Sequence, residues 1–179
     1  DEKIRKIADE LAVSFSAGLH PTVEPANWKG QAGFRLFVSH LSLAKDKATR
    51  LRDCLKDHGI LAFVAHEDIL PALEWQSEME RALGTMDAMV AILTPGFAKS
   101  HWTQQEVGFA VGRGTKVISL KMGEDPVGFI AKQQALSRQR KSAEEVAKDI
   151  VRLLESDHRT SEKVAEAKRR ALQDAEIPF

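Results

Sequence analysis

Short apolar runs alternate with amphipathic segments along most of the chain. Four of these runs have the length and the polar or turn-forming borders of strands, and they cover residues 34–38, 60–65, 88–93 and 116–120. Apolar side chains in the segments between them recur at the spacing of one helix face. This alternation predicts βαβ units, a mostly parallel sheet and helices on both of its faces, which is an α/β fold.

The intervening segments also contain signals for helix boundaries. Helices are predicted near residues 48–58, 75–83, 102–112 and 146–154. Gly59 follows the first of them and is the expected cap, because glycine adopts the left-handed backbone that ends many helices. Ser142 and Glu145 fit a capping box before the last helix. Residues 133–137 are predicted as a short fifth edge strand, although they are polar for a strand.

Segments of a different character flank this alternating region. Apolar residues at helical spacing from Ile4 to Phe15 predict a short helix that ends at Gly18, and prolines and glycines then break the pattern. Residues 161–175 are highly charged with a thin apolar stripe, which fits a solvated helical tail or an oligomerisation segment. The predicted divisions are an N-terminal helix and linker (1–32), a main domain (33–156) and a C-terminal helical extension (157–179).

Length and charge narrow the classes of function. The 179 residues favour one domain with appended helices, and 26 Lys and Arg balance 26 Asp and Glu. The net charge is therefore zero, and the electrostatic field of the whole chain gives no reason to expect nucleic acid or an anionic membrane as a partner. Cys54 is the one cysteine, so neither a disulfide framework nor a cysteine zinc site is expected. The chain begins with charged residues and has no run of about 18 apolar residues, which predicts a cytoplasmic protein that does not span a membrane.

The sequence lacks the motifs of three enzyme classes that share this alternation of strands and helices. The glycine-rich segment Gly112–Thr115 follows a helix, whereas a phosphate-binding P-loop opens one. A phospho-receiver domain needs clustered acids after its first strand to hold a metal, but this strand ends with Val38-Ser39-His40. A Gly-x-Ser-x-Gly nucleophile elbow is also absent from the sequence, which disfavours a serine hydrolase.

Histidines after three strands raise the alternative of a metal site. His40, His66 and His101 each follow a predicted strand, with Glu67 and Asp68 nearby, and three histidines can bind zinc. No two of these histidines have the short paired spacing of a typical zinc motif. We therefore expect no metal.

The heptad Ser100–Glu106, directly after the third predicted strand, contains the strongest candidate chemistry. In a helix, Trp102 and Glu106 share one face because they are four residues apart. They would lie at the carboxyl end of a strand, where ligands bind in open α/β sheets. The alternatives are that Trp102 anchors the core and that Glu106 is a surface acid which favours the first turns of the helix.

Four segments together resemble the TIR (Toll/interleukin receptor) domain family over about residues 33–154. They are Phe34–His40, Phe63–Ile69, Leu93–Phe97, and the pattern Ser100-x-Trp102-x-x-x-Glu106. The resemblance implies a flavodoxin-like three-layer fold with a five-stranded parallel sheet in the order 2-1-3-4-5, flanked by the N- and C-terminal helices. It also supports the edge strand near residue 133.

The resemblance implies one of two functions. Many bacterial, plant and some animal TIR domains are NAD-consuming enzymes with a glutamate where Glu106 falls and a tryptophan where Trp102 falls. This branch implies NAD+ as the substrate, no separate cofactor, and nicotinamide with ADP-ribose or its cyclic form as products. The animal receptor and adaptor branch lacks this glutamate and acts as a non-catalytic interaction module, which is the alternative function.

Other site residues also follow from the resemblance. Ser39 and His40 fall on the site floor after the first strand, and the segment Glu67–Glu74 matches a loop that gates the site. Glu67, Asp68 and Trp75 are therefore expected to contact the substrate, although each also fits a structural loop position. His40-Leu41-Ser42-Leu43 stands where some relatives have arginines, which leaves Lys45 and Arg113 as substitutes for holding a pyrophosphate.

Kinship with this family also implies partners. Catalysis usually depends on self-association, because a second copy completes the site, so we expect a homo-oligomer or filament. A fused or separate sensor domain is a further expected partner. Bacterial members commonly act in defence against phage, by depleting NAD or by making a nucleotide signal.

Overall fold

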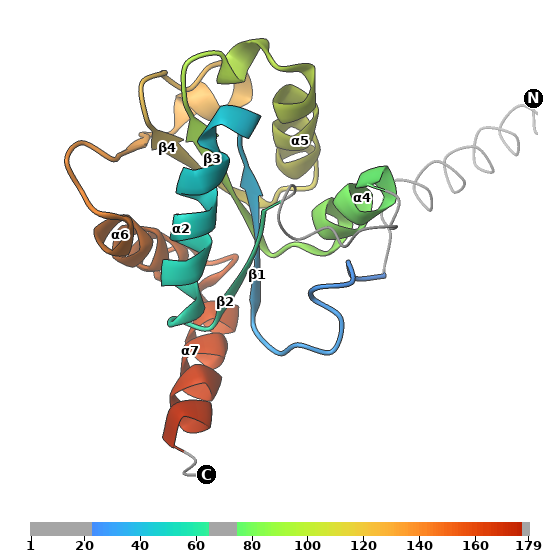
Figure 1. Cartoon of the computed structure of the whole chain (residues 1–179), viewed down its shortest axis with the longest axis vertical. Coiled ribbons are helices and arrows are strands. Elements are labelled where there is room, and N and C mark those ends of the chain that lie inside the picture. Colours follow the sequence, from blue (N-terminus) through green and yellow to red (C-terminus); the bar gives the residue numbers. More distant parts are fainter. Residues whose placement is uncertain (1–22, 65–74, 177–179) are drawn as a thin grey trace, which may run out of the picture.

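A parallel five-stranded sheet forms the centre of the computed structural model, which describes residues 23–64 and 75–176 (Figure 1). The strand order is β2-β1-β3-β4-β5. The strands are β1 (Phe34–Ser39), β2 (Ile60–Phe63), β3 (Ala88–Leu93), β4 (Lys116–Lys121) and β5 (Leu136–Ser137). This topology confirms the predicted flavodoxin-like sheet and its order.

Strand bounds differ from the prediction by one residue at the ends of β1 and β4, and by more at the sheet edges. β3 has the predicted bounds, whereas β2 ends at Phe63 and β5 begins at Leu136. The predicted edge strand is shorter because a 3-10 helix, η3 (Gly128–Lys132), precedes it and β5 pairs with β4 at only two positions. The polar residues before Leu136 therefore form no ladder.

Five α-helices flank the sheet within the described residues. They are α2 (Lys45–Lys56), α4 (Trp75–Thr85), α5 (His101–Gly112), α6 (Ala143–Glu155) and α7 (Ser161–Glu176). Helix α2 begins three residues before the first apolar position used to predict it, since its first turn is polar and solvent-facing. The predicted capping box of Ser142 and Glu145 is confirmed at the start of α6.

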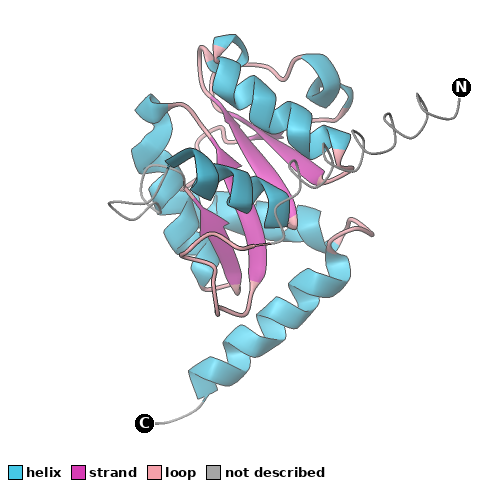
Figure 2. Ribbon diagram, turned by 90° about the vertical axis from the view of Figure 1, so that its right-hand side faces the viewer, coloured by secondary structure: helices cyan, strands magenta, loops and turns pink. Residues whose placement is uncertain are grey.

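The helices form a layer on each side of the sheet (Figure 2). Helices α2, α6 and α7 pack with Leu36 and Val38 of β1 in one core cluster, whereas α4 and α5 pack with Phe37 in another. Successive strand side chains point to opposite faces, so a strand covered on both sides must be apolar throughout. Every residue of β3 is buried, as that rule requires.

The described part of the predicted linker packs on the domain. Trp28 is buried, with its ring centroid 5.7 Å from that of Phe63 in an edge-to-face contact. The backbone N–H of Ala26 donates to Glu78 at 2.7 Å. The predicted boundary at residue 33 stays a prediction, and the N-terminal helix lies outside the described residues.

Helix α7 is docked on the domain through its first half. Val164 and Ala167 are buried in the core cluster, whereas Leu172 is exposed. Gly59 allows this contact because a Cβ atom there would lie 2.4 Å from the Ala167 carbonyl oxygen. The expectation of a fully solvated tail is therefore wrong for the first half of the helix.

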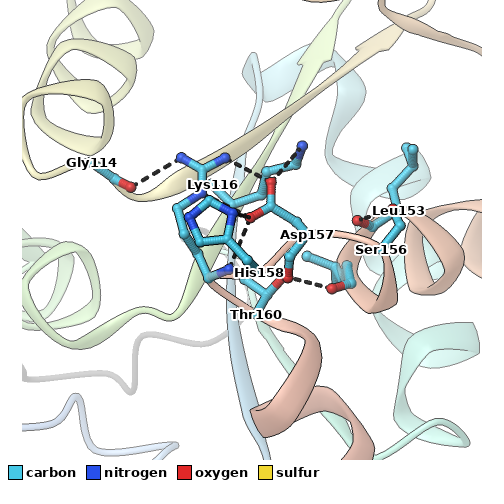
Figure 3. Close-up of polar contacts among 9 residues, drawn as sticks. Gly114, Lys116, Leu153, Ser156, Asp157, His158 and Thr160 are labelled. Atoms are coloured by element: carbon cyan, nitrogen blue, oxygen red, sulfur yellow. Dashed lines mark hydrogen bonds and ion pairs between the residues drawn. The ribbon is translucent and has the colours of Figure 1, made fainter.

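A polar cluster at the α6–α7 junction holds this arrangement (Figure 3). Asp157 pairs with Lys116 at 3.1 Å and accepts hydrogen bonds from Arg159 at 2.7 and 2.9 Å. Arg159 also donates to the Gly114 carbonyl oxygen at 3.1 Å. The hydrogen bonds from Arg159 hold the pKa of the Asp157 carboxyl well below its usual range. The cluster ties α7 to the amino-terminal end of β4.

Within the described residues, no helix is both long enough and apolar enough to cross a membrane.

Candidate active site

The start of α5 is fixed by hydrogen bonds from its own first turn. Ser100 is the N-cap, and its hydroxyl accepts from the Thr103 backbone N–H at 3.4 Å. The Thr103 hydroxyl donates to the Phe97 carbonyl oxygen at 2.7 Å. These contacts hold the helix against the 3-10 turn η2 (Phe97–Lys99), which begins four residues after the end of β3.

Glu124 holds the same turn from the loop after β4. Its two carboxylate oxygens accept from the backbone N–H groups of Gly96 and Ala98 at 2.5 and 2.8 Å. Sequence reasoning missed this residue, because a single acid in a polar loop carries no local signal of a contact 26 to 28 residues away. Glu124 therefore helps to set the direction in which α5 leaves the sheet.

Glu106 lies on the face of α5 that meets the end of β1. Its side chain is only 6% exposed, and Ser39 donates a hydrogen bond to its carboxylate at 2.5 Å. Burial raises the pKa of Glu106 to about 7, and the hydrogen bond from Ser39 opposes part of that rise. No cation in the described residues pairs with this carboxylate. The alternative of a surface acid is therefore wrong.

Glu106 faces a cavity of about 340 Å³ at the carboxyl edge of the sheet. The described residues that line it are Val38, His40, Leu41, Ser42, Trp75, Met79, Ser100, Trp102, Thr103 and Glu106. The cavity has the size of a small-molecule site, and its lining is divided about evenly between apolar and polar side chains. The structure thus brings the predicted residues His40, Trp75 and Trp102 together around Glu106.

Two tryptophans form the outer wall of this cavity. The rings of Trp75 and Trp102 meet edge to face, with centroids 5.0 Å apart and an interplanar angle of 89°. Trp102 is 48% exposed, so the alternative that it anchors the core is wrong. A half-exposed indole beside a buried acid offers a flat surface to a ligand ring.

Ser39 and His40 extend the floor from the end of β1. Ser39 is buried, and its contact with the cavity is through the Glu106 carboxylate. His40 is also buried, with Nδ1 2.9 Å from the Val38 carbonyl oxygen. That hydrogen bond makes Nδ1 the donor and turns the rest of the imidazole toward the cavity it lines.

A smaller cavity of about 200 Å³ lies beyond Trp102, between α4 and α5. Trp102 and Glu106 line both cavities, and Gln105 and Phe109 line only the smaller one. Sequence reasoning missed Gln105, Phe109 and Met79. Their positions on α4 and α5 fit the helical period, but the crossing of the two helices decides which of their side chains meet.

The outcome differs among the other expected residues. Glu67 and Asp68, with the rest of the segment Glu67–Glu74, fall outside the described residues. Arg113 donates to the carbonyl oxygens of Leu83 and Gly84 at the far end of α5, so its expected role in holding a pyrophosphate is wrong. Lys45 is not among the described residues that line the cavity.

Potential metal-binding side chains are scattered over residues 23–64 and 75–176. Within these ranges no three histidine, cysteine, aspartate or glutamate side chains lie close enough together to hold a metal ion. His66, one of the three histidines considered for zinc, lies outside them.

The fold and the cavity define a flavodoxin-like α/β domain with a buried acid at the carboxyl edge of its sheet. A sequence model of the TIR domain matches residues 36–154, which is more than half of the chain. The chain therefore belongs to the TIR domain family, whose members include NAD-cleaving enzymes and signalling modules that self-associate and bind partners.

One solved structure supports the fold at low sequence identity. The TIR domain of the Toll-related receptor TRR-2 from Hydra magnipapillata matches with a TM-score of 0.54 and 16% identity, covering 66% of this chain and 96% of that one. A metazoan TIR-STING receptor from C. gigas, solved in complex with 2',3'-cGAMP, has a TM-score of 0.48 and 15% identity; the match covers 72% of this chain and 42% of that one. No curated protein matches the chain in sequence.

Proposed function

We propose that the chain is an NAD+ nucleosidase, which cleaves the bond between nicotinamide and ribose and uses Glu106 as its catalytic carboxylate. One observation carries the proposal: Glu106 is buried with no paired cation among the described residues, yet it faces a ligand-sized cavity walled by Trp75 and Trp102. Burying an acid in this way costs stability, and such residues concentrate at functional sites.

A second buried acid shows what a structural role demands. Glu78 is as buried as Glu106, but it accepts from Arg81 at 2.7 Å and from the Ala26 backbone N–H at 2.7 Å. Its charge is thus compensated by a cation and a backbone donor. Glu106 has the Ser39 hydroxyl instead, which orients one oxygen without neutralising the charge. The contrast favours a catalytic role for Glu106.

The proposed reaction suits a lone carboxylate. Nicotinamide is cationic in NAD+ and leaves as a neutral molecule, so its departure needs no general acid. The ribose gains oxocarbenium character as the bond breaks, and a nearby carboxylate stabilises that positive charge. Because Glu106 is buried, this attraction is stronger than it is in water. The Ser39 hydroxyl holds Glu106 in place, and the indoles flank the nicotinamide or ribose ring.

The acceptor determines the product. Water gives ADP-ribose, and attack by the adenine of the same molecule gives a cyclic ADP-ribose. Self-association into a homo-oligomer or filament would complete the site, in line with the behaviour of TIR domains. Activation through a fused or separate sensor, in bacterial defence against phage, is the role that the family resemblance favours.

Release of nicotinamide from NAD+ tests the proposal. Concentrated protein, shown to be oligomeric by light scattering, should release nicotinamide, which chromatography quantifies. Glu106→Gln should lower the rate by about 100-fold or more, because the charge that stabilises the transition state is lost. The matched control Glu162→Gln, at an exposed position on α7, should match the parent. No release from the oligomer would instead favour an interaction module, and full activity of Glu106→Gln would refute the site.

A further inference from the structure

A second cavity of about 340 Å³ opens on the other face of the sheet. It lies between α2, the carboxyl ends of β3 and β4, and the first turn of α6, and we call it the α2–α6 cavity. Helices α2 and α6 cover one face of the sheet, whereas α5, which bears Glu106, covers the other. Among the described residues, no side chain lines both this cavity and the Glu106 cavity.

The floor of the α2–α6 cavity is aliphatic. Leu51, Ile92, Leu120 and Val146 line it, and all four are buried members of the core cluster on this face. Met122 also lines it and is partly buried against the same cluster. A cavity with such a floor and this volume suits the apolar body of a small molecule.

The rim of the cavity is cationic. Lys47 and Arg50 come from α2 and Arg138 from the segment after β5, and all three are exposed. None of the three forms an ion pair with an acid in the described part of the chain, whereas Lys121, Lys141 and Arg152 each do. Glu144 is the one acid that lines the cavity, so three positive charges face one negative charge. An excess of unpaired cations around a hollow attracts an organic anion.

We propose that the α2–α6 cavity binds a small organic anion, with its apolar body on the aliphatic floor and its anionic group among Lys47, Arg50 and Arg138. Two sources share this chemistry, a nucleoside monophosphate and a medium-chain fatty acid. The site is separate from the cavity of Glu106 and does not depend on the proposed NAD+ cleavage. Segment His40–Ser42, which lines the Glu106 cavity, runs through the 3-10 turn η1 (Ser42–Ala44) into α2, so the backbone connects the two sites.

Anilinonaphthalene sulfonate is a suitable probe, because it joins an apolar aromatic body to one anionic group and fluoresces when bound. The whole chain should bind it with a Kd below about 1 mM. The double variant Arg50→Glu with Arg138→Glu should weaken binding roughly tenfold or more, since each charge-assisted contact is lost. Lys56→Glu, the same charge reversal at the far end of α2, is the matched control and should bind as the parent does.

Ala143→Trp tests the role of the cavity volume separately from that of the cationic rim. Ala143 lines the cavity and is half-buried, so an indole there fills the hollow while every cation stays in place. This variant should lose binding with an unchanged circular dichroism spectrum. Displacement of the probe by AMP alone would support a nucleotide, and displacement by decanoate alone would support an acyl anion.

Four outcomes would overturn the proposal. They are an absence of probe binding by the parent, equal weakening by Lys56→Glu, unchanged binding by Ala143→Trp, and displacement by inorganic phosphate as effective as that by AMP or decanoate. Sedimentation velocity adds a further check. If the parent self-associates and Ala143→Trp is monomeric, a second copy covers the cavity and the small-anion site is refuted.

Discussion

Replacing Glu106 by glutamine should make the protein more stable at alkaline pH. Glutamine has nearly the same shape and can still accept the hydrogen bond from Ser39, but it cannot ionise. In the parent, ionisation of Glu106 places a charge in a buried position with no paired cation in the described residues. The substitution therefore removes a destabilising charge while keeping the packing.

The size of the effect follows from the pKa of Glu106. Burial raises this pKa from the ordinary 4.5 to about 7, and each pKa unit corresponds to about 1.4 kcal/mol. Between these values the folded state binds more protons than the unfolded state, so stability falls as the pH rises. The parent should lose about 3 kcal/mol from this group between pH 4 and pH 8, and Glu106→Gln should lose none of it.

Urea unfolding at pH 5, 6, 7 and 8, followed by circular dichroism, measures this difference. The gain in unfolding free energy of Glu106→Gln over the parent should be about 3 kcal/mol larger at pH 8 than its value extrapolated to acid pH. Glu78→Gln is the matched control, because that acid is equally buried but paired with Arg81, and its loss should destabilise the protein. A gain that does not change with pH would refute the burial argument.

Three further predictions address the site and the fold. Ser39→Ala removes the hydrogen bond that lowers the pKa of Glu106, the proposed catalytic carboxylate, so the acidic limb of the kcat/KM profile for NAD+ should move to higher pH. An unmoved limb would contradict the role given to Ser39. Gly59→Ala should lower the free energy of unfolding, measured by thermal unfolding, by about 2 kcal/mol or more. Its φ of +73° and the Ala167 carbonyl oxygen 2.4 Å from the new Cβ both oppose a side chain. Gly114→Ala is the control and should cost about 1 kcal/mol, because Gly114 has a φ of +70° but no atom near its Cβ position. Asp157→Asn should lower the free energy of unfolding at pH 7 by about 1 to 3 kcal/mol. This deficit should shrink as the pH falls below about 4, because the pKa of Asp157 is lowered in the folded state and its contribution is lost when the carboxylate is protonated. Asp125→Asn, in an exposed ion pair, should cost less than about 1 kcal/mol.

The buried strands were predictable because their pattern is local. β3 has the predicted bounds, and it is apolar at every position because helices cover both of its faces. β5 was predicted with less success, since its two residues owe their strand conformation to pairing with β4 rather than to their own composition. The burial of Trp28 beside Phe63 could not be predicted either. Its segment is rich in prolines and has no periodicity that would indicate which side chains are buried.

The candidate site was also predictable only in part. Helical spacing alone places Trp102 and Glu106 on one face of α5, and the strand before that helix places both at the carboxyl edge. The spacing does not distinguish which of the two is buried, and the structure buries the acid while it leaves the indole half-exposed. That outcome reverses what hydrophobicity alone favours, and it arises because Glu106 meets the end of β1.

The sequence by itself thus determined the order of strands and helices and the helix face that bears the acid, since both are set by residues close together in the chain. Only the tertiary structure decided the chemistry of Glu106. Its hydrogen bond to Ser39 joins residues 67 positions apart, and its pKa of about 7 comes from burial by neighbours on other elements. Desolvation depends on everything that surrounds a group, so it appears only when the whole chain is folded.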